Sequence, residues 1–157
     1  MKFKILVGTV TRTAAHVAHA IQMDCTDLVA EIEVVLMDGL EIDVFDEDAL
    51  YLICTSTYGS GDVPDNARTL YESLDGRPKF LGHVRYGVIA LGDRSYPQTF
   101  CFGGREFDAR LQGLGARRIG EVWCHDASAG TLPEALGTAW CRAWLKEAIA
   151  ATQEAAA

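Results

Sequence analysis

Hydrophobic and polar residues follow one another along this chain in blocks that predict strands alternating with helices. Four short, largely apolar runs at residues 2–8, 49–55, 85–91 and 118–124 are typical of buried strands. Residues 31–37 alternate like a strand with one buried face. Apolar residues at helical spacing lie between most of these runs and after the last one. This order predicts parallel βαβ units, and therefore an α/β fold with helices on both faces of an open sheet.

Four helices are expected, each marked by a stripe of apolar positions. The second is predicted to begin near Pro64 and the third to end at Gly115, while residues 151–157 are polar and alanine-rich and are expected to fray. No repeat, low-complexity segment or linker divides the chain, so we expect residues 1–157 to form a single domain. The stripes consist of Ala14, Val17, Ala18 and Ile21, then Ala67, Leu70, Tyr71 and Leu74, then Phe107, Leu111 and Leu114, and finally Leu136, Trp140, Ala143 and Trp144.

The size and charge of the chain narrow the classes of function. Its 157 residues are enough to bury one core, and its formal net charge is −8 at pH 7. This charge argues against a nucleic-acid partner, whose phosphates are bound by clustered Lys and Arg, and it suits docking to basic protein surfaces. No apolar run approaches the roughly 20 residues that cross a bilayer, and the start of the chain is interpreted as a buried strand, so no membrane partner is expected.

The cysteines and histidines are scattered along the chain. Five cysteines without a CxxC motif predict reduced, mostly buried thiols in a cytoplasmic protein. His16 and His19 could share a helix face, but no acidic or cysteine companion is near them, so no metal site is predicted. The cysteines are Cys25, Cys54, Cys101, Cys124 and Cys141.

Polar loops follow three of the predicted strands, where ligands of open α/β sheets bind. The first, GTVTRTA at residues 8–14, joins a strand to a helix and would offer backbone N–H groups to a phosphate. Thr9, Thr11 and Thr13 add hydroxyls and Arg12 adds a cation. The alternative that these threonines only cap the helix stays open at this point.

The other two loops each pair glycine with tyrosine. In the second, Tyr58 could project into the crevice as a surface for a flat ligand, or fold back over the sheet. The third loop, LGDRSYPQTFC at residues 91–101, repeats this composition with Tyr96. Two aromatic rings beside a hydroxyl-rich turn predict a slot for a planar ring that bears a phosphate.

Three blocks of sequence carry a family resemblance: residues 9–14, STYGSGDVPDNA at 56–67, and LGDRSYPQTFCFGGREFDARLQGLGA at 91–116. In these blocks the chain resembles the flavodoxins, in particular the small MioC-type flavodoxins, and the FMN-binding domains of diflavin reductases. The resemblance implies a flavodoxin-like three-layer sandwich with a five-stranded parallel sheet in the order 2-1-3-4-5. It also implies FMN as the cofactor.

The resemblance assigns roles to individual residues. Tyr58 and Tyr96 match the aromatic residues on the two faces of the flavin. Gly59 matches a glycine whose peptide group accepts a hydrogen bond from the reduced flavin. Arg12 stands where the family usually has glycine, so the loop is either rebuilt or gains a charge for the phosphate. The implied FMN-binding residues are Thr9, Val10, Thr11, Arg12, Thr13, Ala14, Thr55, Ser56, Thr57, Tyr58, Gly59, Leu91, Gly92, Asp93, Tyr96, Phe100, Cys101 and Asp126.

The function that the resemblance implies is transfer of single electrons. The donor would be an NADPH-linked flavodoxin reductase and the acceptor an electron-requiring enzyme, and no residue of this chain is needed as a nucleophile. Two alternatives on the same fold stay open: an FMN-dependent NAD(P)H or quinone reductase, and a flavin-free interaction module. A receiver-type signalling domain is disfavoured, because the ends of the first and third strands carry threonines rather than an acidic cluster.

Overall fold

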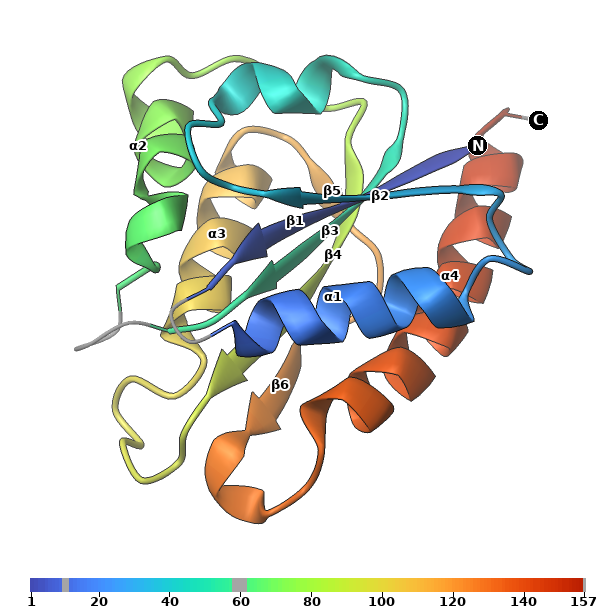
Figure 1. The fold of residues 1–157 in the computed structure, drawn as a ribbon. Helices are drawn as coiled ribbons and strands as arrows, with labels where there is room; N and C mark the ends of the chain where they lie inside the picture. Colours follow the sequence, from blue (N-terminus) through green and yellow to red (C-terminus); the bar gives the residue numbers. More distant parts are fainter. Residues whose placement is uncertain (10–11, 58–61, 157) are drawn as a thin grey trace.

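The structure is a computed structural model that describes residues 1–9, 12–57 and 62–156. Its core is a parallel sheet in the order β2-β1-β3-β4-β5, with β6 also paired to β4 (Figure 1). This confirms the predicted fold and strand order. The strands are β1 (Lys2–Gly8), β2 (Glu31–Leu36), β3 (Leu50–Thr55), β4 (Arg85–Gly92), β5 (Arg117–Arg118) and β6 (Trp123–Asp126).

The predicted fifth strand differs from expectation because it is interrupted. Tyr86 pairs with Arg118 and Ile89 pairs with Trp123, so residues 119–122 lie opposite only residues 87–88 of β4. The chain therefore bulges between β5 and β6, both of which remain parallel to β4.

The bulge is held by a long-range hydrogen bond. Gly120 adopts a positive φ of 70°, and the indole Nε1 of Trp144 donates to the carbonyl oxygen of Ile119 at 2.8 Å. The Ile119 carbonyl is thus satisfied by a helix packed on the sheet instead of by a neighbouring strand.

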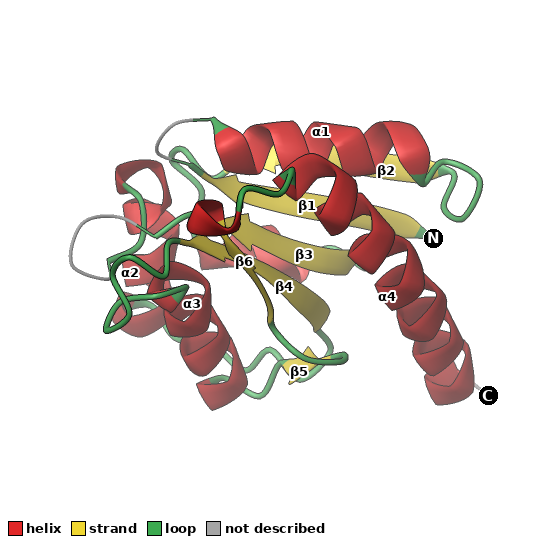
Figure 2. Cartoon of the chain, turned by 90° about the horizontal axis from the view of Figure 1, so that it is seen from below, coloured by secondary structure: helices red, strands yellow, loops and turns green. Residues whose placement is uncertain are grey.

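The helices form two layers around the sheet. Helices α1 (Thr13–Asp24) and α4 (Pro133–Ala156) pack together on one face, where α4 crosses the strands in Figure 2. Helices α2 (Arg68–Gly76) and α3 (Phe102–Gly113) cover the other face. The helix α4 continues to Ala156, through the segment that the sequence predicts to fray. No helix in the described part of the chain has the length and apolar character needed to cross a membrane.

Alternating side chains of the strands fill the two layers. In β1, Phe3, Ile5 and Val7 belong to the cluster under α1 and α4, and Leu6 belongs to the cluster on the other face. All four side chains are fully buried, as the apolar run at residues 2–8 predicts. The buried strands fix the positions at which their loops emerge.

Short 3₁₀ turns complete the layer of α2 and α3. Residues Ile42–Asp46 bury Ile42 and Phe45 against that layer, and Asp65–Ala67 leads directly into α2. The second helix therefore begins at Arg68, after one such turn that follows Pro64.

Candidate functional site

The loops expected to hold a ligand emerge from one edge of the sheet. Gly8 pairs with Thr55, Thr55 with Ala90, and Ala90 with Cys124, so the carboxyl ends of four strands form one row. A pocket of about 780 Å³ opens beyond this row. That volume is within the range of small-molecule and cofactor sites.

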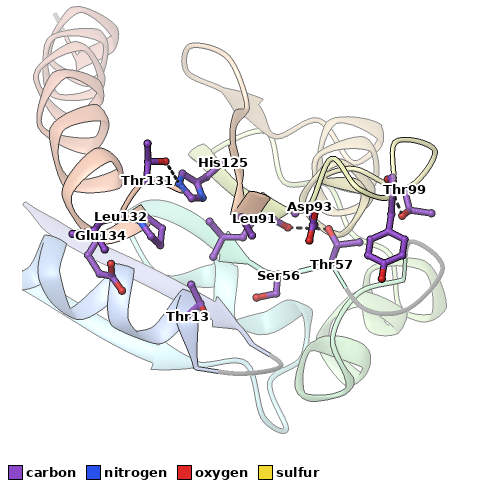
Figure 3. Close-up of a pocket in the computed structure, with 14 residues that line it drawn as sticks. Thr13, Ser56, Thr57, Leu91, Asp93, Thr99, His125, Thr131, Leu132 and Glu134 are labelled. Atoms are coloured by element: carbon purple, nitrogen blue, oxygen red, sulfur yellow. Dashed lines mark hydrogen bonds between the residues drawn. The ribbon is translucent and has the colours of Figure 1, made fainter. Parts of the chain in front are cut away.

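Seven of the residues predicted from the sequence line this pocket. Figure 3 shows Asp93 and Thr99 on one side of the pocket, with His125 and Glu134 on the side of α4. The seven are Thr13, Ser56, Thr57, Leu91, Gly92, Asp93 and Tyr96. The structure thus brings together residues from all three predicted loops.

The remaining predicted residues fall into two groups. Val10, Thr11, Tyr58 and Gly59 lie outside the described residues, so their roles stay predictions. The second group does not line the pocket: Thr9, Arg12, Ala14, Thr55, Phe100, Cys101 and Asp126. Of these, the side chains of Ala14, Thr55 and Cys101 are completely buried and support the site from within the core.

The loop before α1 contains a buried hydroxyl group, that of Thr9, which has no hydrogen-bond partner among the described residues. The backbone N–H of Thr9 donates to Oδ1 of Asn66 at 2.9 Å, and Nδ2 of Asn66 donates to the carbonyl of Val7 at 3.1 Å. The Thr9 Oγ1 atom is buried and has no hydrogen-bond partner among the described residues. A buried unpaired hydroxyl costs free energy, which an oxygen of a bound phosphate would recover.

Arg12 stands at the position where a glycine was expected from the family resemblance. It has a φ of 69°, which is the left-handed conformation that glycine adopts without cost. Arg12 therefore takes a backbone conformation that favours glycine. Arg12 directly precedes α1, and no side-chain hydrogen bond from it caps the helix.

The loop after β4 is held by turns of its own. The carboxylate Oδ1 of Asp93 accepts from the backbone N–H of Ser95 at 2.8 Å, and the N–H of Tyr96 donates to the carbonyl of Asp93 at 3.0 Å. The next turn is closed by the N–H of Thr99, which donates to the carbonyl of Tyr96 at 3.1 Å. These turns accommodate residues 97–99 and leave Tyr96 at the pocket with 68% of its surface exposed.

Asp126 supports this loop. Its Oδ1 accepts hydrogen bonds from the backbone N–H of Arg94 and of Ser128, both at 2.9 Å, and from the Ser128 hydroxyl at 2.7 Å. The pKa of Asp126 is lowered, first by the hydrogen bond from the Arg94 backbone and then by Ser128. The carboxylate thus joins the loop after β4 to the end of β6.

Thr57 joins the second loop to the third. Its hydroxyl donates to the carbonyl of Leu91 at 3.1 Å and accepts from the N–H of Gly103 at 3.0 Å. A Cβ at Gly103 would lie 2.3 Å from the carbonyl oxygen of Ser56, so the backbone contact requires glycine. Thr57 therefore fixes the spacing between the pocket wall and the start of α3.

The end of β6 and the segment after it form a pocket wall that the sequence reasoning missed, since the predicted Asp126 does not line the pocket. Nε2 of His125 lies 2.9 Å from the hydroxyl of Thr131. The rule that ligand residues follow strand ends would have pointed to His125, which directly follows the fifth apolar run at residues 118–124. The missed lining residues are Thr99, His125, Ala127, Thr131, Leu132, Pro133 and Glu134.

The strand order and the position of the pocket define a class: a doubly wound α/β protein with its ligand site at the topological switch point. The family model described as flavodoxin matches residues 5–140. The chain belongs to the flavodoxin family.

Individual relatives agree with this assignment. The chain is 41% identical to flavodoxin YqcA of Pectobacterium carotovorum over 140 residues, which cover 89% of this chain and 92% of that protein. It is 34% identical to protein MioC of Escherichia coli O157:H7 over 96 residues, which cover 61% and 65% of the two chains. A 70-residue match at 53% identity to the sulfite reductase flavoprotein alpha-component of Bacillus subtilis covers 43% of this chain and 11% of that protein.

A solved structure shows the same fold. The C101A mutant of flavodoxin from Pseudomonas aeruginosa superposes with a TM-score of 0.80 at 31% identity, covering 94% of this chain and 99% of that one. The resemblance to flavodoxins, MioC-type proteins and diflavin FMN domains is therefore confirmed.

FMN is the cofactor of this family, and the residues present fit it. The unpaired Thr9 hydroxyl belongs to the loop that leads into α1, and the first turn of a helix offers backbone N–H groups that suit an anion. Tyr96 offers an exposed aromatic face at the pocket. The start of α1 with Thr9 would suit the phosphate of FMN, and Tyr96 would suit its ring.

Proposed function

We propose that this protein transfers single electrons from an NADPH-linked reductase to an acceptor enzyme, with FMN bound at the pocket described above. The observation that carries the proposal is a cofactor-sized pocket at the carboxyl ends of the strands, lined by residues of all three predicted loops. When bound, FMN supplies the electron-carrying ring, and the protein binds and orients it.

The phosphate end would be held at the start of α1. The first N–H groups of a helix have no partner within the helix, and together with its dipole they favour an anion. Thr9 adds a hydroxyl, Thr13 lines the pocket, and Arg12 brings a positive charge to the same turn. These groups select a flavin that carries a phosphate over one that does not.

The ring end would lie between the loop after β4 and the second loop. Leu91, Gly92 and Asp93 place backbone groups along the pocket, and Tyr96 is free to stack on a planar ring. Gly92 cannot carry a side chain, since a Cβ there would lie 2.6 Å from the backbone nitrogen of Cys101. The end of β4 can therefore pack directly against the residue that precedes α3. Tyr58 and Gly59, which the family resemblance assigns to the ring, complete this proposal.

Apolar side chains around the pocket suit contact with a redox partner. Tyr96, Phe102 and Leu132 are 68%, 40% and 70% exposed, and each lies in or next to the loops of the site. The exposed Asp62 and Glu106 lie on the side of Phe102. Such a mixture suits transient contact with a basic partner surface, in which charge sets the rate of encounter.

The visible absorption spectrum of the purified protein, followed by release and chromatography of any flavin, tests the cofactor. We expect close to one equivalent of FMN, and reduction of this FMN by NADPH only when a flavodoxin reductase is added. A colourless protein that does not take up added FMN would overturn the proposal in favour of a flavin-free module. Steady oxidation of NADPH by the protein alone would instead identify a reductase.

A further inference from the structure

Two cysteines that are distant in the sequence meet where α3 begins. Cys101 directly precedes α3, is completely buried, and its Sγ lies 3.3 Å from the carbonyl oxygen of Ala90. Cys124 pairs with the same Ala90 from β6. Each of these two thiols is the largest influence on the pKa of the other, so the two side chains lie next to each other.

A cation lies against only one of these sulfurs. Nη2 of Arg105, from the first turns of α3, donates to Sγ of Cys124 at 3.4 Å. The Cys101 thiol, followed by the charges of Arg105 and Arg94, lowers the pKa of Cys124 to about 6 against the opposing effect of burial. The pKa of Cys101 is raised, first by Cys124 and then by burial. These effects together favour the thiolate at Cys124 over a thiolate at Cys101.

A second pair shares the mutual influence, with the pKa of Cys25 lowered first by Cys141, but it differs in its burial and in its cation. Cys25 and Cys141 also lie next to each other, but both are completely buried under α1 and α4. The nearby Arg142 is engaged by the carboxylates of Asp24 and Asp27, at 3.2 Å and 2.8 Å. Cys124, in contrast, is partly exposed, which a reacting thiolate requires.

We propose that Cys101 and Cys124 form an oxidation site for hydroperoxides, in which Cys124 is the reacting thiolate and Cys101 the resolving thiol. The Cys124 sulfur attacks one oxygen of hydrogen peroxide, the O–O bond breaks, and sulfenic acid and hydroxide form. The sulfur of Cys101 then attacks that of Cys124, the S–O bond breaks, and the proton of Cys101 leaves with the oxygen as water. The two thiols lose two electrons, and the peroxide is reduced to water.

The site is next to the wall of the FMN pocket. The backbone nitrogen of Cys101 lies 2.6 Å from the position that a Cβ of Gly92 would take, and Gly92 lines the pocket. A bond between Cys101 and Cys124 would tie the end of this loop to β6. The proposal rests on the two thiols and Arg105, and it holds whether or not the protein carries electrons.

The test uses the full-length reduced protein as purified, treated with a small excess of hydrogen peroxide. We expect two of the five thiols to be lost. Peptide mapping should then show a disulfide between Cys101 and Cys124. In C101S the sulfenic acid at Cys124 should persist and react with a cyclic dione, whereas C124S should form neither product. C25S is the matched control and should lose the same two thiols at the same rate.

The dependence on charge and pH distinguishes this site from incidental oxidation. The rate should rise with pH and level off above about 6, instead of following an ordinary thiol with a pKa of about 8.5. R105Q should slow the reaction at least about threefold near pH 6.5, and R105K should restore part of it. Retention of all five thiols, an equal yield of a Cys25–Cys141 disulfide, or an unchanged rate in C124S would overturn the proposal.

Discussion

The loops before α1 and α3 both contain a residue other than glycine in a left-handed backbone conformation, but different interactions offset the cost of that conformation. Each ends in a residue other than glycine with a positive φ, 69° at Arg12 and 60° at Cys101, and neither side chain caps its helix. A left-handed conformation costs such a residue about 1–2 kcal/mol. Cys101 is completely buried and its sulfur contacts the carbonyl of Ala90, whereas Arg12 is exposed.

This difference indicates that the two loops are stabilised by different means. Packing inside the protein holds the loop before α3 in its strained conformation. The loop before α1 carries the same strain at Arg12 together with the unpaired Thr9 hydroxyl, and the ligand proposed to bind there would account for both. The following predictions test that contrast.

The largest effect is expected at the glycines that end β1 and β4. In G92A the new Cβ would lie 2.6 Å from the backbone nitrogen of Cys101, which cannot move alone, so we expect a loss of about 2–3 kcal/mol. In G8A the closest atom, at 2.5 Å, is the side-chain hydroxyl oxygen of Thr55, which can rotate away, and the loss should be about half as large. Urea unfolding measures both values. Equal losses would show that packing holds the two loops alike.

The second effect concerns the hydroxyl groups of Thr9 and Thr57, which should contribute differently to FMN binding and to stability. T9V should weaken FMN binding about tenfold and leave the unfolding free energy of the FMN-free protein unchanged or slightly higher, because the hydroxyl it removes is unpaired. T57V is the matched variant and should destabilise the FMN-free protein by about 1–2 kcal/mol, because the N–H of Gly103 loses its acceptor. Fluorescence titration with FMN and urea unfolding give the two quantities. A T9V protein that loses stability without FMN would contradict the role given to Thr9.

The third effect is a gain in stability. R12G should raise the unfolding free energy of the FMN-free protein by about 0.5–1 kcal/mol, since glycine adopts the left-handed conformation freely. R12A removes the charge but keeps the strain, so it should not stabilise the protein. If both variants weaken FMN binding equally, the guanidinium contributes to phosphate binding. If neither does, the charge has no part in binding.

The smallest effect should come from Asp126. Since its folded-state pKa is lowered, the ionised carboxylate contributes stability above its ordinary pKa of about 4, and that contribution is lost as the pH falls below this value. D126N should therefore lower the melting temperature slightly at pH 7, and the difference from the unsubstituted protein should shrink below about pH 4. A constant difference across this range would mean that geometry, not charge, holds the loop.

The sequence predicted the fold well because the sheet is built from apolar runs that can form only buried strands. Phe3, Ile5 and Val7 show this within a single run. The break in the fifth strand could not be predicted, because residues 118–124 form a continuous strand pattern. The bulge depends on the Trp144 indole, 25 residues from the carbonyl that it binds.

The candidate site was predicted as far as it follows strand ends. Thr57, Leu91 and Tyr96 fall at the pocket for that reason. The contributions of Asn66 and Leu132 were missed, since they depend on how the turn Asp65–Ala67 and the start of α4 approach the loops in space. The pairing of Cys101 with Cys124 leaves no motif, because the two thiols meet only through strand register.

The two ends of the sheet have a further consequence for association between copies of the chain. Strand β2 forms one edge, where Lys2 contacts Glu31 and Glu33, at 3.5 Å and 3.6 Å, and presents charge to any approaching strand. The opposite edge is broken between β5 and β6 by the bulge at Gly120. Exposed edges invite strand addition and aggregation only when they are long, flat and apolar. In the described part of this chain neither edge meets that condition, so neither edge favours the addition of a strand from a second copy.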